Sequence, residues 1–284
     1  MMAGPTLAGI QRIVAVVGCQ RSGTTLTGQL LGAHPEAILL DEWDGLYPWF
    51  HAQAAGPAES LAQAMLHAAA AKYADPGSRV QVRDGRAALA PGITTLVLKA
   101  PNLTYDDGKL AQLPVPVAVL HPVRDPRGVV ASMARLDGID FVGNQMRLMQ
   151  QRPATAAEYA AELRVIADPD QPVWVRRAVV WRVKSGRAAA FAGHGIPTCQ
   201  FRYEDLTAGP EAVVADLLRT CGLPSSSAAL CAHESYRGRG PGGTDRTRAV
   251  DSASLRAWDG VLDAAQQADV LRAAGPLAAE FGYG

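Results

Sequence analysis

The clearest chemical signal in the sequence is a short glycine-containing loop, Gly18-Cys19-Gln20-Arg21-Ser22-Gly23-Thr24-Thr25. The loop follows a run of β-branched residues and opens a helical pattern, which is the context that a phosphate-binding loop requires. At such a place, backbone N–H groups and the positive end of a helix dipole hold an anion. We therefore predict that this segment, called the 18–25 loop below, binds a phosphate group.

The loop departs from the pattern that binds nucleoside triphosphates. Where that pattern has a lysine for the β- and γ-phosphates, this chain has Thr24, and the nearby cation is Arg21. Thr25 can serve as one magnesium ligand, but no predicted apolar strand ends in the aspartate that supplies the second, and Leu40-Asp41-Glu42 is a weak candidate. The loop therefore favours an anionic donor that needs no metal ion. A P-loop small-molecule kinase that uses Mg-ATP is kept as an alternative.

Strand and helix patterns alternate along the chain and define the elements that must position this loop. Runs of apolar and β-branched residues predict buried strands at 13–17, 94–98, 115–120 and 197–202. Helical periodicity predicts helices at 24–33, 60–74, 173–192, 210–221 and 264–281, and one more that begins at Pro126. This alternation predicts an α/β protein of the P-loop type, with three layers and a central, mostly parallel sheet flanked by helices.

The composition excludes several classes of function. The 284 residues suffice for one α/β domain over 1–284, in which we expect 1–11 to be a flexible N-terminus. Lysine plus arginine equals aspartate plus glutamate at 27 each, so no basic excess points to nucleic acid as a partner. No apolar run reaches the roughly 18–20 residues of a membrane span, and we expect a cytoplasmic protein. The four cysteines lack the spacing of a zinc site, so no metal site is predicted.

Several further segments of the sequence match, together with the 18–25 loop, the motifs of a known protein family. They are Ala33-His34-Pro35-Glu36, Asp41-Glu42, Pro122-Val123-Arg124-Asp125-Pro126-Arg127 with Ser132, Phe201-Arg202-Tyr203-Glu204-Asp205-Leu206, and the closing residues 275–283. With these segments the chain resembles the sulfotransferases that use 3′-phosphoadenosine-5′-phosphosulfate (PAPS), and it looks closest to their tyrosylprotein branch. The resemblance covers most of the chain and is vague in 43–92 and 136–166.

The resemblance implies a donor and a site for it. PAPS would give up its sulfuryl group without a metal ion and leave as 3′-phosphoadenosine-5′-phosphate (PAP). In that family the loop grips the 5′-phosphosulfate end, and here Arg124 and Ser132 would hold the 3′-phosphate. The residues expected to contact the donor are Gln20, Arg21, Ser22, Gly23, Thr24, Thr25, Arg124, Ser132, Tyr203 and Arg248.

Three residues are candidates for the chemistry of sulfuryl transfer. The planar guanidinium of Arg21 can bridge the sulfuryl group and the 5′-phosphate. Lys99 directly follows a predicted strand, where open α/β sheets place ligands, and it resembles the family's sulfate-side lysine. Glu42 stands where the tyrosylprotein branch has a glutamate, so it is our candidate general base. Its neighbours Asp41 and Asp44 leave that assignment open.

The expected reaction is in-line transfer to the hydroxyl of an alcohol or phenol, with a small molecule favoured over a protein as acceptor. We expect the acceptor pocket in the variable stretches 43–73 and 138–167. A catalytically silent nucleotide-binding module is the remaining alternative. The basic residues between Arg176 and Arg187 are interpreted as a solvated helix face, and the glycine-rich stretch 238–248 as a lid over the nucleotide.

Overall fold

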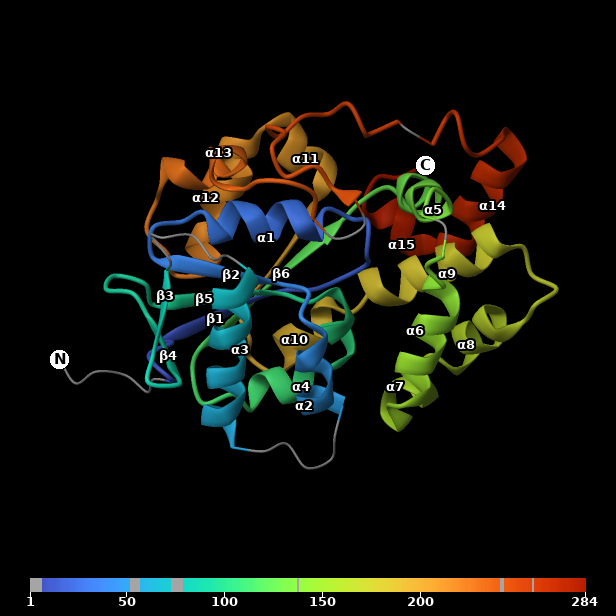
Figure 1. Cartoon of the computed structure of the whole chain (residues 1–284). Helices are drawn as coiled ribbons and strands as arrows, with labels where there is room; N and C mark the ends of the chain where they lie inside the picture. The colour runs from blue at the N-terminus through green and yellow to red at the C-terminus, as the bar shows by residue number, and fades with distance from the viewer. Residues whose placement is uncertain (1–6, 52–56, 73–78, 137, 241–242, 257) are drawn as a thin grey trace.

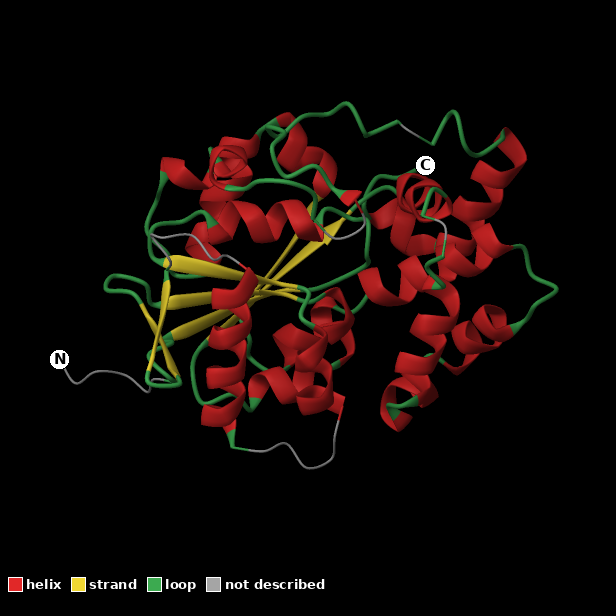
Figure 2. Cartoon of the chain, viewed as in Figure 1, coloured by secondary structure: helices red, strands yellow, loops and turns green. Residues whose placement is uncertain are grey.

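Five parallel strands form the sheet at the centre of the structure (Figure 1, Figure 2). The structure is a computed structural model that describes residues 7–51, 57–72, 79–136, 138–240, 243–256 and 258–284. The strands are β1 (Arg12–Val16), β2 (Ala37–Asp41), β5 (Thr95–Lys99), β6 (Val117–Val123) and β7 (Thr198–Arg202), in the order β2-β5-β1-β6-β7. The predicted α/β fold with a central parallel sheet is confirmed.

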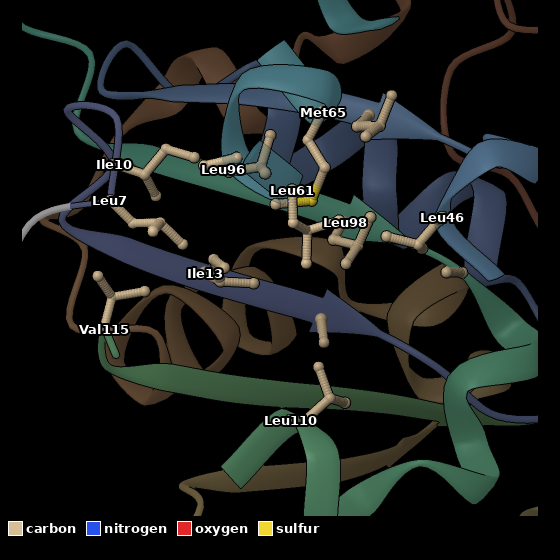
Figure 3. Close-up of a cluster of buried hydrophobic side chains, with 14 of the residues drawn as sticks. Leu7, Ile10, Ile13, Leu46, Leu61, Met65, Leu96, Leu98, Leu110 and Val115 are labelled. Atoms are coloured by element: carbon tan, nitrogen blue, oxygen red, sulfur yellow. The ribbon is translucent and has the colours of Figure 1, made fainter. Parts of the chain in front are cut away.

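Successive residues of each strand point to opposite faces of the sheet, which gives the protein a core on each face. Ile13 of β1 belongs to the cluster on one face and Val14 to the cluster on the other. Figure 3 shows the first cluster, in which Leu61 and Met65 of α3 (Ala58–Lys72) lie close to the strands. Because both faces are covered, β1, β5 and β6 are continuous apolar runs, and this pattern predicted them. The strand expected at 197–202 is present as β7, whose residues are only half-buried.

Helices cover both faces of the sheet, so the three predicted layers are present (Figure 1). One face carries α1 (Thr24–Gly32), α11 (Tyr203–Ala208), α12 (Pro210–Thr220) and α13 (Ala232–Ser235). The other carries α2 (Tyr47–His51), α3, α4 (Asp107–Ala111) and α10 (Ala188–Gly193). A further group, at the right of Figure 1, consists of α5 (Pro126–Ala134), α6 (Phe141–Gln150), α7 (Pro153–Glu158), α8 (Ala160–Ala167), α9 (Val173–Ser185), α14 (Ala264–Ala274) and α15 (Pro276–Glu280). In the described parts of the chain, no helix is long and apolar enough to cross a membrane.

Two predicted helices are each broken into two. The helix expected at 173–192 ends at Ser185 and restarts as α10, because the chain turns at Gly186. The helix expected at 264–281 is broken at Gly275, whose φ of 66° ends α14. Pro276, which lacks an N–H group, then starts α15.

Other corrections concern short segments. The edge strand β2 and the separate hairpin of β3 (Val80–Arg83) and β4 (Arg86–Leu89) were not predicted, because runs of four or five residues carry little periodicity. Within the segment 1–11, which we expected to be a flexible N-terminus, Leu7 and Ile10 are buried in the core. Residues 1–6, and residues 73–74 of the helix expected at 60–74, lie outside the described residues.

His121 of β6 supports the 18–25 loop from within the sheet. Gly18 has a φ of 116°, and a Cβ on it would lie 3.3 Å from the His121 ring. The ring is completely buried, with Nε2 donating to the carbonyl of Lys184 over 3.0 Å and Nδ1 accepting from Gln200 over 3.3 Å. Burial lowers the pKa of His121 to about 4, so the ring is neutral where the loop rests on it.

We expect His121 to make the folded protein less stable in mild acid. Its pKa is about 6.5 in the unfolded chain and about 4 in the folded protein, so between these pH values the unfolded chain binds more protons. The free energy of unfolding should therefore fall by up to about 3 kcal/mol as the pH is lowered through this window. Urea unfolding of His121→Gln should lose this part of the pH dependence, and the exposed-site variant His194→Gln should keep it. Equal slopes in all three proteins would contradict the assignment.

Candidate active site

The carboxyl ends of five parallel strands meet at one edge of the sheet, and the predicted site residues lie there. The 18–25 loop follows β1, Glu42 follows β2, Lys99 ends β5, Arg124 follows β6 and Tyr203 follows β7. All five strands point the same way, so segments far apart in sequence converge at this edge. Ligands of open α/β sheets bind at the carboxyl ends of the strands.

Two adjoining cavities open at this edge. The smaller has a volume of about 200 Å³ and is lined by Gln20, Glu42, Lys99, Tyr47, Asn102 and Gln145 among others. The larger has a volume of about 400 Å³ and is lined by Gly23, Arg124, Ser132, Tyr203 and Arg248 among others. Arg21, Thr24, Thr25 and Leu136 line both. The larger volume lies within the ~300–1,000 Å³ typical of ligand pockets. All the residues predicted for the donor and for catalysis, except Ser22, therefore line one or both of two cavities that share Arg21.

The start of α1 lies between these cavities and has the features that favour an anion. Gly23 has a φ of 97°, and a Cβ on it would lie 2.4 Å from the Tyr203 ring, so only glycine fits this turn. Gly23 is also the N-cap of α1 and offers no side-chain cap, and the first turn holds no acidic residue. No side chain therefore competes with an anion for the first N–H groups of the helix.

Arg21 lies at the boundary of the two cavities in a strained conformation. Its φ of 70° is in the left-handed region, which costs a residue with a Cβ about 1–2 kcal/mol. Its Nε donates to Ser132 Oγ over 2.9 Å. Burial and then the charge of Arg124 lower the pKa of Arg21. Two guanidinium groups that oppose each other's charge fit an anionic ligand, which would relieve that repulsion.

Arg124 is the second cation of the larger cavity. Its guanidinium lies 4.9 Å from the centre of the Tyr203 ring and donates to the carbonyl oxygens of Arg21 and Ser254. Its Nε is buried and makes no hydrogen bond with the described residues. The donors of this cavity thus include the guanidinium groups of four arginines, hydroxyl groups and a helix N-terminus, which is a set that fits a ligand with phosphate groups; the arginines are Arg21, Arg124, Arg135 and Arg248.

Glu42 and Lys99 form an ion pair in the smaller cavity. The Lys99 side chain is buried, and its Nζ contacts Glu42 Oε1 and lies 3.3 Å from Asp41 Oδ1. Like Arg21, Glu42 has a left-handed backbone conformation, with a φ of 41°. The Glu42 side chain is 35% exposed and lines the smaller cavity. The ammonium of Lys99 thus holds the Glu42 carboxylate in place in a cavity that Arg21 also lines.

Asp41 corrects one expectation from the sequence. β2 is buried throughout and ends in Asp41, so an apolar strand does end in an aspartate, as the second magnesium ligand of a kinase would require. Its carboxylate lies between two cations, Lys99 and Arg246, with Arg246 Nη2 2.6 Å from Oδ2. Among the described residues, no group of three or more His, Cys, Asp or Glu side chains could hold a metal ion. Arg246 belongs to the predicted 238–248 lid, of which 241 and 242 lie outside the described residues.

The structure divides the residues predicted to contact the donor. Those that line the larger cavity are Arg21, Gly23, Thr24, Thr25, Arg124, Ser132, Tyr203 and Arg248. Gln20 lines only the smaller cavity, and Ser22 is buried beneath the loop and lines neither. The Ser22 side chain is therefore not placed to contact a ligand in either cavity. Arg248 is exposed and pairs with Asp251, so it sits at the rim.

The basic stretch of α9 is not the solvated face that was expected. Lys184 is fully buried and donates to Gln20 Oε1 over 2.7 Å and to Asn102 Oδ1 over 3.3 Å, and both partners line the smaller cavity. Arg187 is buried as well. Sequence analysis missed Lys184 and Asn102, although Lys184 stands three residues after the buried Trp181 and so shares its helix face.

Two substitutions at Arg21 separate its charge from its backbone strain. Arg21→Ala removes the guanidinium and keeps a Cβ, so the strain of the left-handed conformation stays. Arg21→Gly removes both the guanidinium and the strain, because glycine adopts a positive φ at little cost. We expect the glycine variant to be the more stable by about 1 kcal/mol in urea unfolding. The two variants should have lost anion binding to the same extent. An alanine variant that is equally or more stable would show that the φ of 70° carries no strain.

Comparison with known proteins agrees with this geometry. A sequence model of the sulfotransferase family matches residues 14–227. The sulfotransferase domain of the olefin synthase from Synechococcus PCC 7002 has the same fold, with 18% identity, a TM-score of 0.51 and 95% of each chain covered. The sulfotransferase domain from the curacin biosynthetic pathway is similar too, with 16% identity, a TM-score of 0.50, and 96% of this chain and 97% of that chain covered. No protein of curated function matches the sequence.

The family match covers the 18–25 loop and the strand ends that bear Glu42, Lys99, Arg124 and Tyr203. The narrower resemblance to the tyrosylprotein branch stays a prediction. The fold, the two cavities and the matched residues together lead to one conclusion: the chain belongs to the sulfotransferase family.

Proposed function

We propose that this sulfotransferase moves the sulfuryl group of PAPS to the hydroxyl of a small alcohol or phenol, with Glu42 as the general base. One observation carries the proposal. Arg21 and Arg124 line a cavity at the uncapped start of α1, and this cavity adjoins the one that holds the Glu42–Lys99 pair. An adenylate with phosphate groups at its 3′ and 5′ positions suits the first cavity, and a hydroxyl compound suits the second.

Each of the predicted residues then has a task. Arg124 and Ser132 would hold the 3′-phosphate, and the start of α1 with Thr24 and Thr25 would hold the 5′-phosphate. Tyr203, stacked under Arg124, and the rim residue Arg248 would close the donor cavity.

Proton transfer and charge stabilisation fall to residues at the boundary. When bound, PAPS supplies the sulfuryl group, and the oxygen of its 5′-phosphate keeps the electron pair of the broken S–O bond. Glu42 would take the proton of the acceptor hydroxyl as the new O–S bond forms. Arg21 and Lys99 would stabilise the negative charge on the sulfuryl and phosphate oxygens, a contribution worth about 10²–10³ in rate per donor in other enzymes.

A kinase that uses Mg-ATP is the second candidate, and one observation favours it. β2 ends in Asp41, at the place where a magnesium-binding aspartate would stand. Against it, that carboxylate already lies between Lys99 and Arg246, and Thr24 stands in place of the phosphate-binding lysine. Ligand preference separates the two candidates directly.

Binding of PAP tests the donor. Isothermal titration calorimetry without divalent metal should show PAP binding, and Mg-ATP should bind much more weakly or not at all. Arg124→Leu should weaken PAP binding about 10- to 100-fold, because a charge-assisted hydrogen bond is lost. Arg127→Leu is the matched control: Arg127 pairs with Asp125 and does not line the cavity, so PAP affinity should be kept. Tight Mg-ATP binding with no PAP binding would favour the kinase.

Turnover with labelled PAPS and a panel of small alcohols and phenols tests the chemistry. Glu42→Gln should lower kcat about 10²- to 10⁴-fold and leave PAP affinity unchanged. Asp44→Asn, which changes another carboxylate that lines the same cavity, should stay within a few fold of the parent protein. The opposite pattern would assign the base to Asp44. PAP binding without turnover on any acceptor would instead favour a catalytically silent nucleotide-binding module.

A further inference from the structure

Glu204 is a carboxylate at the edge of the sheet to which the proposed transfer reaction gives no task. It follows Tyr203 in the first turn of α11 and lines neither of the two cavities. Its Oε1 accepts a hydrogen bond of 3.0 Å from the backbone N–H of Asp125, and its Oε2 accepts one of 2.6 Å from the hydroxyl of Tyr283. Both oxygens are held by donors of the protein itself, which indicates that this carboxylate supports other groups and does not contact a ligand.

Two successive contacts connect the ends of β6 and β7. The two strands are parallel neighbours and are paired up to their last residues. At the first position after each strand, the Arg124 guanidinium lies over the Tyr203 ring, 4.9 Å from its centre. At the second position, the N–H of Asp125 donates to Glu204. The contact with Glu204 therefore fixes the backbone directly beside two residues that line the larger cavity.

The peptide group between Arg124 and Asp125 is held at both of its polar atoms. Its oxygen accepts a hydrogen bond of 2.9 Å from Nε1 of the completely buried Trp181. Its N–H group donates to Glu204 Oε1 over 3.0 Å. Because a peptide group is planar, fixing both atoms fixes the plane that contains the Arg124 Cα atom, from which the guanidinium side chain leaves the backbone.

Tyr283 in turn holds Glu204. The Tyr283 side chain is buried and packs edge to face against Trp181, with ring centres 6.4 Å apart. Its single hydroxyl hydrogen goes to Glu204 Oε2, because the carbonyl of Val123 is uncharged and lies farther away, at 3.4 Å. Burial, and then the charge of Glu204, raise the pKa of Tyr283, so the hydroxyl keeps its proton and stays a donor. Trp181 and Glu204 both contact Tyr283, so the three side chains form one connected support for the end of β6.

Arg124 is a buried cation whose position depends on this support. The carboxylate next to it in the chain, Asp125, pairs with Arg127 instead. The Arg124 guanidinium donates to the carbonyl oxygens of Arg21 and Ser254, and its Nε makes no hydrogen bond with the described residues. Uncharged carbonyls leave the positive charge of Arg124 available for an anion. In enzymes a misplacement of about 1 Å can cost about 10²-fold in rate, so the direction of such a group matters.

We propose that Glu204 is a positioning residue for the 3′-phosphate of the donor: it orients Arg124 through the N–H of Asp125, and Tyr283 keeps Glu204 in place. The inference rests on the proposed function, which puts the 3′-phosphate at Arg124 and Ser132. It adds a determinant of ligand choice. A guanidinium oriented in this way selects a nucleotide with phosphates at the 3′ and 5′ positions over one with a 5′-phosphate alone.

The test compares PAP with adenosine 5′-phosphate, which lacks only the 3′-phosphate. Calorimetric titration without divalent metal gives the Kd of each nucleotide, and the ratio of the two isolates the contribution of the 3′-phosphate. Glu204→Ala should lower this preference for PAP about 5- to 10-fold, because a hydrogen bond that orients Arg124 is lost, and should leave the affinity for adenosine 5′-phosphate unchanged. Glu204→Gln should keep most of the preference, since its amide oxygen can still accept from Asp125 and its amide nitrogen can donate to Tyr283.

A pair of tyrosine variants provides a matched control. Tyr283→Phe removes the donor that holds Glu204, so it should lower the preference for PAP in the same direction as Glu204→Ala. Tyr105→Phe also removes the hydroxyl of a buried tyrosine, but this hydroxyl donates to Gln145 beside the smaller cavity, over 3.3 Å. The preference of Tyr105→Phe for PAP should equal that of the parent protein.

A double variant distinguishes positioning from a general loss of structure. When added to Arg124→Leu, Glu204→Ala should not lower the preference for PAP any further, because it acts through Arg124. An unchanged preference in Glu204→Ala, an equal loss of affinity for both nucleotides, or an additive loss in the double variant would overturn the proposal. If Glu204→Ala fails to fold, Tyr283→Phe decides by the same readout. A parent protein that binds PAP no more tightly than adenosine 5′-phosphate would remove the proposed function as well.

Discussion

Positive charge gathered at the amino end of one helix is the constraint that organises this protein. Arg124 is buried and Arg21 is partly buried, and burial and then the charge of Arg124 lower the pKa of Arg21. The uncapped start of α1 adds the positive end of its dipole at the same place. Such an arrangement opposes folding of the ligand-free chain and favours an anion, because a negative ligand removes the repulsion and satisfies the donors together. The same positive charge therefore lowers the folding stability of the ligand-free protein and favours binding of an anion.

Backbone strain is found at two of the candidate site residues. Arg21 and Glu42 are two non-glycine residues with positive φ, and they are also the proposed donor clamp and the proposed base. Left-handed residues persist only where the surrounding structure holds them. Ser132 receives a hydrogen bond from Arg21, and Lys99 pairs with Glu42. The rigid strand ends therefore aim the two side chains at a common boundary, as catalysis by preorganised groups requires.

The two cavities share a wall, so the proposed donor and acceptor could bind side by side. The donor set of the larger cavity is cationic, whereas the smaller combines apolar side chains, amides and carboxylates. Under the proposed function, this difference in polarity would direct the charged donor to the larger cavity and the neutral acceptor to the smaller one. Beside the smaller cavity, Lys184 donates to Gln20 and Asn102, and because an ammonium group can only donate, the amide oxygens of both residues point toward it.

The sequence alone determined the class of fold and the position of the 18–25 loop, because these depend on local patterns. The strand at β1, the glycines of the 18–25 loop and the following helix are neighbours in the chain, so their spacing carries the information. Arg124 and Ser132 were assigned from a resemblance, and they lie together beside Arg21 in the structure. The sequence could not show that Gln20 and Ser22 do not line the larger cavity, because side chains in a loop follow no regular alternation from which their directions could be predicted.

Only the tertiary structure decided which side chains from different strand ends contact each other. The pairing of Asp41 with Arg246 joins residues 205 positions apart, and no local pattern relates them. Lys184 looked like part of a solvated face because charge usually marks the surface of a helix, yet the packing of α9 placed it in the interior. Its polar partners come from the loop after β1 and the turn after β5, so only the folded sheet brings the network together.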